Sequence, residues 1–296
     1  MAKTELPKYS AYNGEKQIAL LDTTVISFMN GLADKGFSPE VLLKDYDVIL
    51  IPEWVAEEVY DSERRACYLR KLLSAGYPIR LVEETKYTEL ANFEEGNLYE
   101  IVCASVSRIA SIKSYLRRNV KTADPLDMDA YQVWIKELYE QWPEPAETLK
   151  SGRIKKKNAG EISITILAEI FSWYYPDMKM ITVYSQDRDT YAFINAAAES
   201  LLQNRFRNAT MVPVSYKSND AILCQMFRNE ELTESDILAL RKDARRLTYT
   251  KVLEDKSVAV NSGIIENDEY NKEIGTIVRI VCGNQRFTRS YTWIMD

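Results

Sequence analysis

Short apolar runs that alternate with segments of helical spacing constrain the fold of this chain most. Residues 17–22, 48–51 and 180–184 are short, apolar and strand-like, and each is followed by residues whose apolar positions recur at helical intervals. Strands that alternate with helices are typical of a mostly parallel sheet covered by helices on both faces. The sequence therefore predicts an α/β fold.

This α/β pattern occupies two separated blocks of one predicted domain, residues 1–216. Residues 83–157 between them lack strand-like alternation and indicate a helical insertion. We expect a continuous helix from Pro52 to about Gly76, a short strand at 81–82 and another strand at 211–214. Residues 217–296 are expected to form a C-terminal helical and β extension. Its expected parts are a capping box at 233–236 and strands at 257–265 and 275–282.

The absence of histidine from all 296 residues narrows the chemistry most. Without an imidazole, the chain cannot carry a Ser-His or Cys-His relay, a histidine-based ribonuclease mechanism or a histidine-ligated zinc site. Its four cysteines are scattered and form no CxxC pair, which argues against a zinc ribbon or redox motif. Reactive chemistry would have to rest on carboxylates, other polar side chains or a metal held by oxygen ligands.

Composition indicates an ordinary globular protein. The hydrophobic share is 46% and the charged share 28%. The N-terminal residues are hydrophilic, and no apolar run approaches the roughly 20 residues that cross a bilayer. We therefore expect a cytoplasmic protein that does not enter membranes. The net charge of -6 attracts no polyanion, so a nucleic-acid site would have to be local.

Two aspartates stand directly after predicted strands. In open parallel sheets, ligands bind beyond the carboxyl ends of the strands, so Asp22 and Asp187 are expected at the functional edge. Each has a structural alternative, since an aspartate after a strand often caps the following helix. Their shared position carries more information than either residue alone.

Two glutamates are candidates for the same edge. Glu58 lies on one helical stripe with Val55 and Val59, whereas Glu57 is turned about 100° away, so Glu58 is expected to border the packed face. Glu161 is expected in the first turn of a helix that runs through Trp173. The structural alternatives are a solvated surface glutamate for Glu58 and a favourable helix-dipole interaction for Glu161.

At this point the residues resemble a known family. LLDTTVI, beginning at Leu20, is similar to the opening of PIN-domain proteins, in which a strand ends in an acid followed by a small polar residue. The segments IPEWVAEEV, NAGEISITILAE and VYSQDRDTYAF are similar to the second, third and fourth acidic segments of that family. The resemblance spans about residues 17–60 and 158–215. Gln186 stands where the family often has Asp or Asn, the helical insertion is long for the family, and the extension past 216 has no counterpart.

The resemblance implies a PIN-like sheet and a divalent metal site. The acidic quartet would be Asp22, Glu58, Glu161 and Asp187, with Asp189 as an auxiliary ligand. Carboxylates that converge without a counter-ion repel one another, and oxygen ligands suit Mg²⁺ or Mn²⁺. Such ions can activate water for attack on a phosphodiester. The function implied is a metal-dependent endonuclease that cleaves RNA in preference to DNA and serves as a toxin or phage-defence effector.

The sequence also predicts which residues contact nucleic acid and which regions bind other partners. Phosphate contacts are expected from a basic run before Glu161 and from a residue beside Asp187, namely Arg153, Lys155, Lys156, Lys157 and Arg188. The alternative for the basic run is a solvated loop. The insertion would cap the substrate. The extension would bind an inhibitor protein, an activator protein or a second copy of the chain.

Three other functions compete with this interpretation. A haloacid-dehalogenase-like phosphatase also begins with an acid after its first strand, but it needs Asp-x-Asp and this chain has Thr24. A catalytically inactive PIN-like module that binds RNA or a protein is the principal alternative. An α/β scaffold that acts through its insertion and extension is the third.

Overall fold

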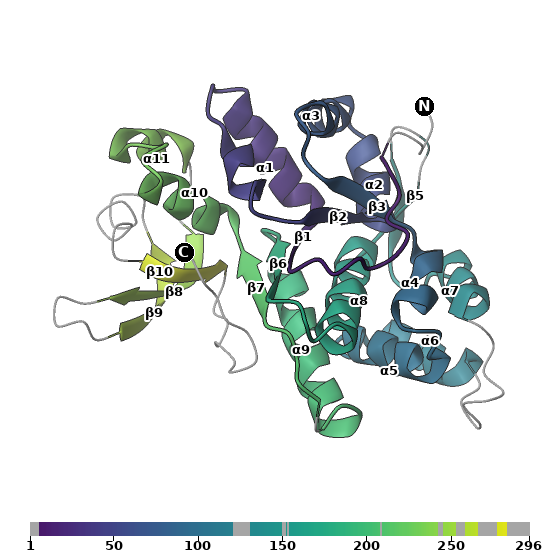
Figure 1. Cartoon of the computed structure of the whole chain (residues 1–296). Coiled ribbons are helices and arrows are strands. Elements are labelled where there is room, and N and C mark those ends of the chain that lie inside the picture. The colour runs from purple at the N-terminus through teal and green to yellow at the C-terminus, as the bar shows by residue number, and fades with distance from the viewer. Residues whose placement is uncertain are drawn as a thin grey trace.

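A computed structural model of the chain describes residues 6–120, 131–149, 152, 154–207 and 209–241 in full (Figure 1). For residues 245–252, 258–265 and 277–282 it describes the backbone alone. The N-terminal two thirds contain a sheet with helices on both faces, and a smaller sheet follows towards the C-terminus.

The central sheet has five strands in the order β3-β2-β1-β6-β7, and all neighbouring pairs are parallel. The α/β expectation is therefore confirmed. β1 lies in the middle, between β2 and the much later β6. The strands are β1 (Gln17–Leu21), β2 (Val48–Pro52), β3 (Ile79–Val82), β6 (Met180–Tyr184) and β7 (Val214–Lys217).

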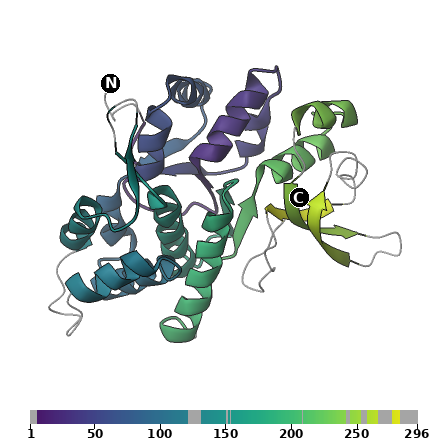
Figure 2. The ribbon, with the colours of Figure 1, turned by 180° about the vertical axis from the view of Figure 1, so that it is seen from behind.

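Helices cover both faces of this sheet, which explains why its strands are mostly apolar. Figures 1 and 2 show α1 and α3 on one face and α8 and α9 on the other. The covering elements are α1 (Thr23–Ala33), the 3₁₀ helix η1 (Pro39–Leu43), α2 (Glu53–Tyr60), α3 (Glu63–Ser74), α8 (Ala159–Tyr174) and α9 (Arg188–Asn204).

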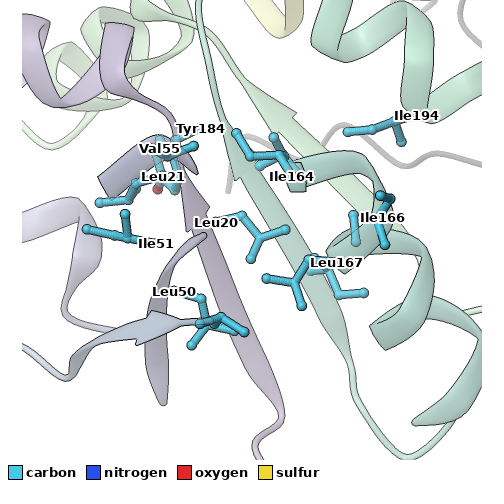
Figure 3. Packing of buried hydrophobic residues seen from close by; sticks show 14 of the residues in the cluster. Leu20, Leu21, Leu50, Ile51, Val55, Ile164, Ile166, Leu167, Tyr184 and Ile194 are labelled. Atoms are coloured by element: carbon cyan, nitrogen blue, oxygen red, sulfur yellow. The ribbon is translucent and has the colours of Figure 1, made fainter. Parts of the chain in front are cut away.

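The core lies on both faces of the sheet, under α1 and α3 on one side and under α8 on the other. All five residues of β2 are buried, as are all but the first of β1. Figure 3 shows Leu20 of β1 on the side of the sheet that faces Leu167 of α8, and both side chains are fully buried. Burial of such side chains stabilises the fold by about 1.5–3 kcal/mol each.

The helix expected from Pro52 to Gly76 is interrupted. α2 ends at Tyr60 and α3 begins at Glu63, because Ser62 between them has an extended backbone with φ -124° and ψ 114°. Asp61 and Ser62 are poor helix formers whose side chains compete for backbone hydrogen bonds. The expected end at Gly76 is confirmed, since this glycine has a φ of +88°.

The strand expected at 211–214 is shifted towards the C-terminus. Val212 donates its backbone N–H to the Ser172 carbonyl oxygen at the end of α8, and Pro213 has no N–H for a ladder. Strand β7 therefore begins at Val214 and continues through Tyr216 and Lys217. The polar character of these last residues concealed the strand in the sequence.

The insertion is helical, as expected, except at its end. Residues 146–156 contain a two-stranded antiparallel hairpin, so the expectation of an insertion without strands was wrong. Ala146, Glu147 and Thr148 are all exposed, and such a hairpin lacks the apolar alternation that predicts strands. The elements are η2 (Glu84–Lys86), α4 (Tyr87–Leu90), α5 (Glu95–Ser105), α6 (Ala110–Asn119), α7 (Tyr131–Glu140), β4 (Ala146–Thr148) and β5 (Ile154–Lys156).

The C-terminal extension combines two helices with a three-stranded antiparallel sheet of order β10-β8-β9. The capping box at Thr233 and Asp236 is present, and β9 and β10 lie close to the expected ranges. Strand β8 was not expected. The elements are α10 (Asn219–Arg228), α11 (Glu234–Leu240), β8 (Arg245–Val252), β9 (Val258–Ile265) and β10 (Ile277–Cys282). Among the described residues, no helix has the length and apolar character required to cross a bilayer.

We expect the central sheet to depend on Leu20. Replacing Leu20, which is 0% exposed, with alanine removes buried methyl groups and should lower the free energy of unfolding by about 2–5 kcal/mol. Leu202→Ala on α9 is the matched control, because this leucine is 40% exposed and should cost less than about 0.5 kcal/mol. Urea unfolding followed by circular dichroism measures both. Equal losses would contradict the assignment of the core.

Candidate active site

Parallel pairing of β1 with β6 brings Asp22 and Asp187 to the same edge of the sheet. Leu21 lies opposite Tyr184, and the pairing continues one residue further, since the Asp22 N–H donates to the Tyr184 carbonyl oxygen at 2.9 Å. Strand β1 leads into α1 after Asp22, and strand β6 leads into α9 after Asp187. The two aspartates thus occupy the carboxyl end of the sheet, where ligands bind in this architecture.

A serine hydroxyl links the two aspartates. Ser185 Oγ donates to Asp22 Oδ2 at 2.8 Å and accepts the Asp187 backbone N–H at 2.9 Å. The Thr24 hydroxyl donates to the same Asp22 oxygen at 2.5 Å. With only 5% of its surface exposed, Asp22 is held in one orientation by these donors.

Both aspartates also cap helices. Asp22 Oδ1 accepts the Thr23 N–H at 2.7 Å, and Asp187 Oδ1 accepts the Asp189 N–H at 2.7 Å. The helix-cap alternative from the sequence is therefore present in the structure. It coexists with the shared position at the sheet edge, because a capping bond uses one lone pair of one carboxylate oxygen.

Glu58 and Glu161 meet where α2 packs against α8. A Cβ atom placed on Gly160 would lie 3.5 Å from Val55 Cγ2 and 4.0 Å from Glu58 Oε1, so the Glu58 carboxylate lies beside the first turn of α8. Glu161 is in that first turn. Glu58 also lies 3.8 Å from Lys155 Nζ on the β4–β5 hairpin. This position is consistent with the expectation that Glu58 borders the packed face of its helix.

The four carboxylates influence one another electrostatically. Burial raises the pKa of Asp22 despite its hydrogen bonds from Thr24, Ser185 and Thr23, and the charge of Asp187 raises it further. Burial also raises the pKa of Glu58, where Lys155 opposes the effect and Asp22 adds to it. The pKa of Glu161 rises to about 8, because of burial and then the charges of Asp22, Asp187 and Glu58. Such interactions require the carboxylates to lie near one another.

Other predicted site residues lie at the margin or elsewhere. Asp189 and Arg188 are exposed in the first turn of α9, where the Asp189 backbone N–H donates to Asp187 Oδ1. Lys156 lies over the Trp54 ring, and Lys157 is exposed after β5. Arg153 lies outside the described residues. Of the predicted cations, Lys155 lies within ion-pair distance of an acidic-site carboxylate, that of Glu58.

The carboxylates are not arranged as a closed set of metal ligands. Within the described residues, no group of three acidic or cysteine side chains has the spacing of a formed metal site. The donor chemistry nevertheless suits a hard cation, since the cluster offers carboxylate oxygens and the pKa of Glu161 is high without a counter-ion. The capping hydrogen bonds of Asp22 and Asp187 account for part of the difference, because they hold these side chains toward their own helices.

Sequence reasoning missed several residues that fix this edge. The hydroxyl groups of Thr24 and Ser185 both position the Asp22 carboxylate. Tyr216 of β7 donates its hydroxyl to the Asp187 carbonyl oxygen, and Gln186 Oε1 accepts the Asn219 N–H at 2.9 Å. A strand assignment that extended to Tyr216 would have identified the first contact, because β7 is parallel to β6 and ends at the same edge.

Comparison with known proteins identifies no relative of this chain. No protein-family model, no curated protein and no solved structure matches the chain. The functional argument therefore depends on the residues and their geometry.

The pKa of Glu161 predicts how stability depends on pH. This carboxyl has an ordinary pKa of 4.5 and a folded pKa of about 8, so the folded chain binds more protons than the unfolded chain between these values. The free energy of unfolding should therefore fall as the pH rises through this window in EDTA. Glu84, whose pKa is also raised to about 8 by burial, adds a fall of the same sign.

Thermal unfolding in EDTA between pH 5 and pH 8 measures this fall. Glu161→Gln should make the decline of Tm shallower, because the amide does not ionise. The exposed Glu199→Gln on α9 is the control and should leave the slope unchanged. Identical slopes in wild type and Glu161→Gln would contradict the buried, charge-coupled position of Glu161.

Proposed function

We propose that this chain is a metal-dependent endonuclease of the PIN kind, which hydrolyses phosphodiester bonds in RNA in preference to DNA. The observation that carries the proposal is the meeting of four carboxylates from four separate segments at one sheet edge. Asp22, Glu58, Glu161 and Asp187 are coupled electrostatically, with Glu161 most strongly affected. The RNA preference and a role as a toxin or phage-defence effector come from the resemblance of the four acidic segments to PIN-domain proteins.

Mg²⁺ or Mn²⁺ is the cofactor that this proposal requires. Asp22, Glu58, Glu161 and Asp187 would hold it, and the exposed Asp189 would be an auxiliary ligand. When bound, the ion would supply activation of water and neutralisation of charge on the phosphate. It would also favour the ionised form of Glu161, whose pKa burial and neighbouring carboxylates now raise.

The chain's own residues orient the site before any ligand arrives. Thr24 and Ser185 hold Asp22 by hydrogen bonds of 2.5 and 2.8 Å, which limits the rotation of its carboxylate. The first turns of α1 and α9 fix the two aspartates relative to the sheet. Prior orientation of catalytic groups lowers the entropy lost on reaching the transition state.

Cations at the margin would contact the nucleic-acid backbone. Lys155 and Lys157 lie on or just after β5, directly before α8 and Glu161, and Arg188 follows Asp187. Because the whole chain has a net charge of -6, such local cations would have to attract the phosphates. Their position beside the acidic edge supports this role.

A catalytically inactive PIN-like module that binds RNA or a protein is the second candidate. One observation favours it: Asp22 and Asp187 both serve as helix caps, and the described carboxylates form no closed metal-ligand set. In that case the acidic edge would be structural. Cleavage assays separate the two functions.

Cleavage is expected to depend on both the metal and Asp22. Purified chain should cut labelled RNA in Mn²⁺, and EDTA should abolish the cleavage. Asp22→Asn keeps the shape of the side chain but removes a charge, so it should lower the rate by about a hundredfold or more. Glu199→Gln, which removes an exposed carboxylate further along α9, should retain wild-type activity.

A parallel reaction with labelled DNA tests the substrate preference. Cleavage that survives both EDTA and Asp22→Asn would overturn the mechanism. RNA binding without cleavage in either metal would support the inactive module instead.

Lysine contacts to phosphate predict a salt dependence. Lys155→Gln and Lys157→Gln should each weaken the binding of single-stranded RNA and reduce the slope of log K against log salt by about 0.7. Lys136→Gln on α7 is the control, because this side chain is 75% exposed and pairs with Glu140 of its own helix. Filter binding at several salt concentrations measures the slope. An unchanged slope for Lys155→Gln and Lys157→Gln would remove these residues from the interface.

A further inference from the structure

A pocket adjoins the acidic edge and shares residues with it. Its volume is about 380 Å³, within the range of roughly 300–1,000 Å³ that small-molecule sites occupy. Its walls come from the first turns of α2, the β4–β5 hairpin and the start of α8. Glu58 and Lys155, which form the 3.8 Å contact of the acidic site, are both in the lining. A ligand group here would therefore be next to a phosphate held at the acidic edge.

One face of an indole ring is presented to this pocket. The ring of Trp54 packs on the ring of Tyr139, with 4.4 Å between centroids, and Tyr139 does not line the pocket. The Lys156 ammonium lies 4.9 Å from the centroid of the same indole, and Lys156 does line the pocket. On the pocket side the indole is thus covered by the long, flexible side chain of Lys156, which a planar group could replace.

The indole is supported firmly from behind. Tyr139 is buried and donates its hydroxyl to Glu84 Oε1 at 2.8 Å. Its ring is also stacked on Trp142, with 5.1 Å between centroids and 12° between planes. Three aromatic rings therefore lie in series, and Trp54 is the member that reaches the pocket. A supported aromatic ring of this kind is a platform on which a flat ligand can stack.

The charges of the pocket favour a planar neutral group over an anion. The carboxylates of Glu53, Glu57 and Glu58 line it together with the ammonium groups of Lys155 and Lys156. A bare phosphate would meet three acids against two bases. A nucleobase carries no charge and bears both hydrogen-bond donors and acceptors, so it can use both kinds of side chain while its ring stacks on Trp54.

We propose that this pocket receives one unpaired base of the substrate strand, stacked on Trp54. The inference rests on the proposed nuclease function and specifies its substrate: the strand is single-stranded at the nucleotide beside the cut. A base held in a helix is stacked on its neighbours and cannot enter a side pocket, whereas an unpaired base can be turned out onto an aromatic side chain. Trp54 is then a binding residue, and the acidic edge remains the centre of the chemistry.

Uncharged nucleosides test the pocket without depending on cleavage. The full chain is labelled with 5-fluorotryptophan and titrated in EDTA with adenosine, guanosine, cytidine or uridine while the fluorine spectrum is recorded. The chain has five tryptophans, and Trp54→Phe identifies the Trp54 resonance by its loss. This resonance should shift and saturate with at least one nucleoside. If no nucleoside shifts it, or if all five tryptophan signals move equally, the proposal fails.

Substitutions test the same contact with a short single-stranded RNA in EDTA. Stacking on one aromatic side chain predicts that Trp54→Leu weakens binding by about tenfold to about a hundredfold, and that Trp54→Phe restores most of it. Trp142→Leu is the matched control, since it removes a tryptophan from the same aromatic series but does not line the pocket. Equal losses for Trp54→Leu and Trp142→Leu would assign the effect to packing and overturn the proposal.

The two proposals fail in distinguishable ways. A Trp54 shift with nucleosides in a chain that cleaves nothing would sink the nuclease function and leave the base pocket. Metal-dependent cleavage with no effect of Trp54→Leu on KM for single-stranded RNA would sink the pocket and leave the nuclease. Where both hold, Trp54→Leu should raise KM for a single strand and leave kcat close to that of wild type.

Discussion

The parallel pairing of β1 with β6 is the contact on which the rest of the structure depends. It joins the two α/β blocks into one sheet and brings together Asp22 and Ser185, which are 163 residues apart in the chain. The residues between β1 and β6, including the whole insertion, connect these two neighbouring strands. A parallel pair needs a long crossover, and here that crossover also delivers Glu58 and Glu161 to the same edge. The acidic cluster is therefore a direct product of the topology.

The features that could be predicted from the sequence are those with strong local patterns. Buried parallel strands are mostly apolar, which makes residues 17–21 and 180–184 evident, and Asp22 follows the first of them. The exposed strand β4 of the hairpin has no such pattern. The start of β7 at Val214 depends on a tertiary contact, the bond from Val212 to the end of α8. No local signal carries that information.

The candidate site likewise has some features that local sequence patterns predict and others that they do not. The side of α2 occupied by Glu58 follows from helical spacing, and its contacts agree with that expectation. The platform behind Trp54 could not be predicted, because Tyr139 is contributed by the insertion, far from Trp54 in the chain. Whether Asp22 caps a helix or contributes to an acidic cluster was posed as an alternative. In the structure the same carboxylate is at the N-terminus of α1 and close to Asp187. A capping bond leaves lone pairs that remain available.

The late position of β6 also affects when the protein acquires its acidic edge during synthesis. A ribosome adds roughly 5–20 residues per second, and domains fold from the N-terminus as they emerge, so the 163 residues between Asp22 and Ser185 correspond to about 10 to 30 s. During that interval β1 has β2 beside it and an unpaired edge where β6 will bind. Ser185 and Asp187 reach Asp22 only after the insertion has been made. A nascent chain therefore carries Asp22 through the synthesis of the whole insertion before its carboxylates can assemble.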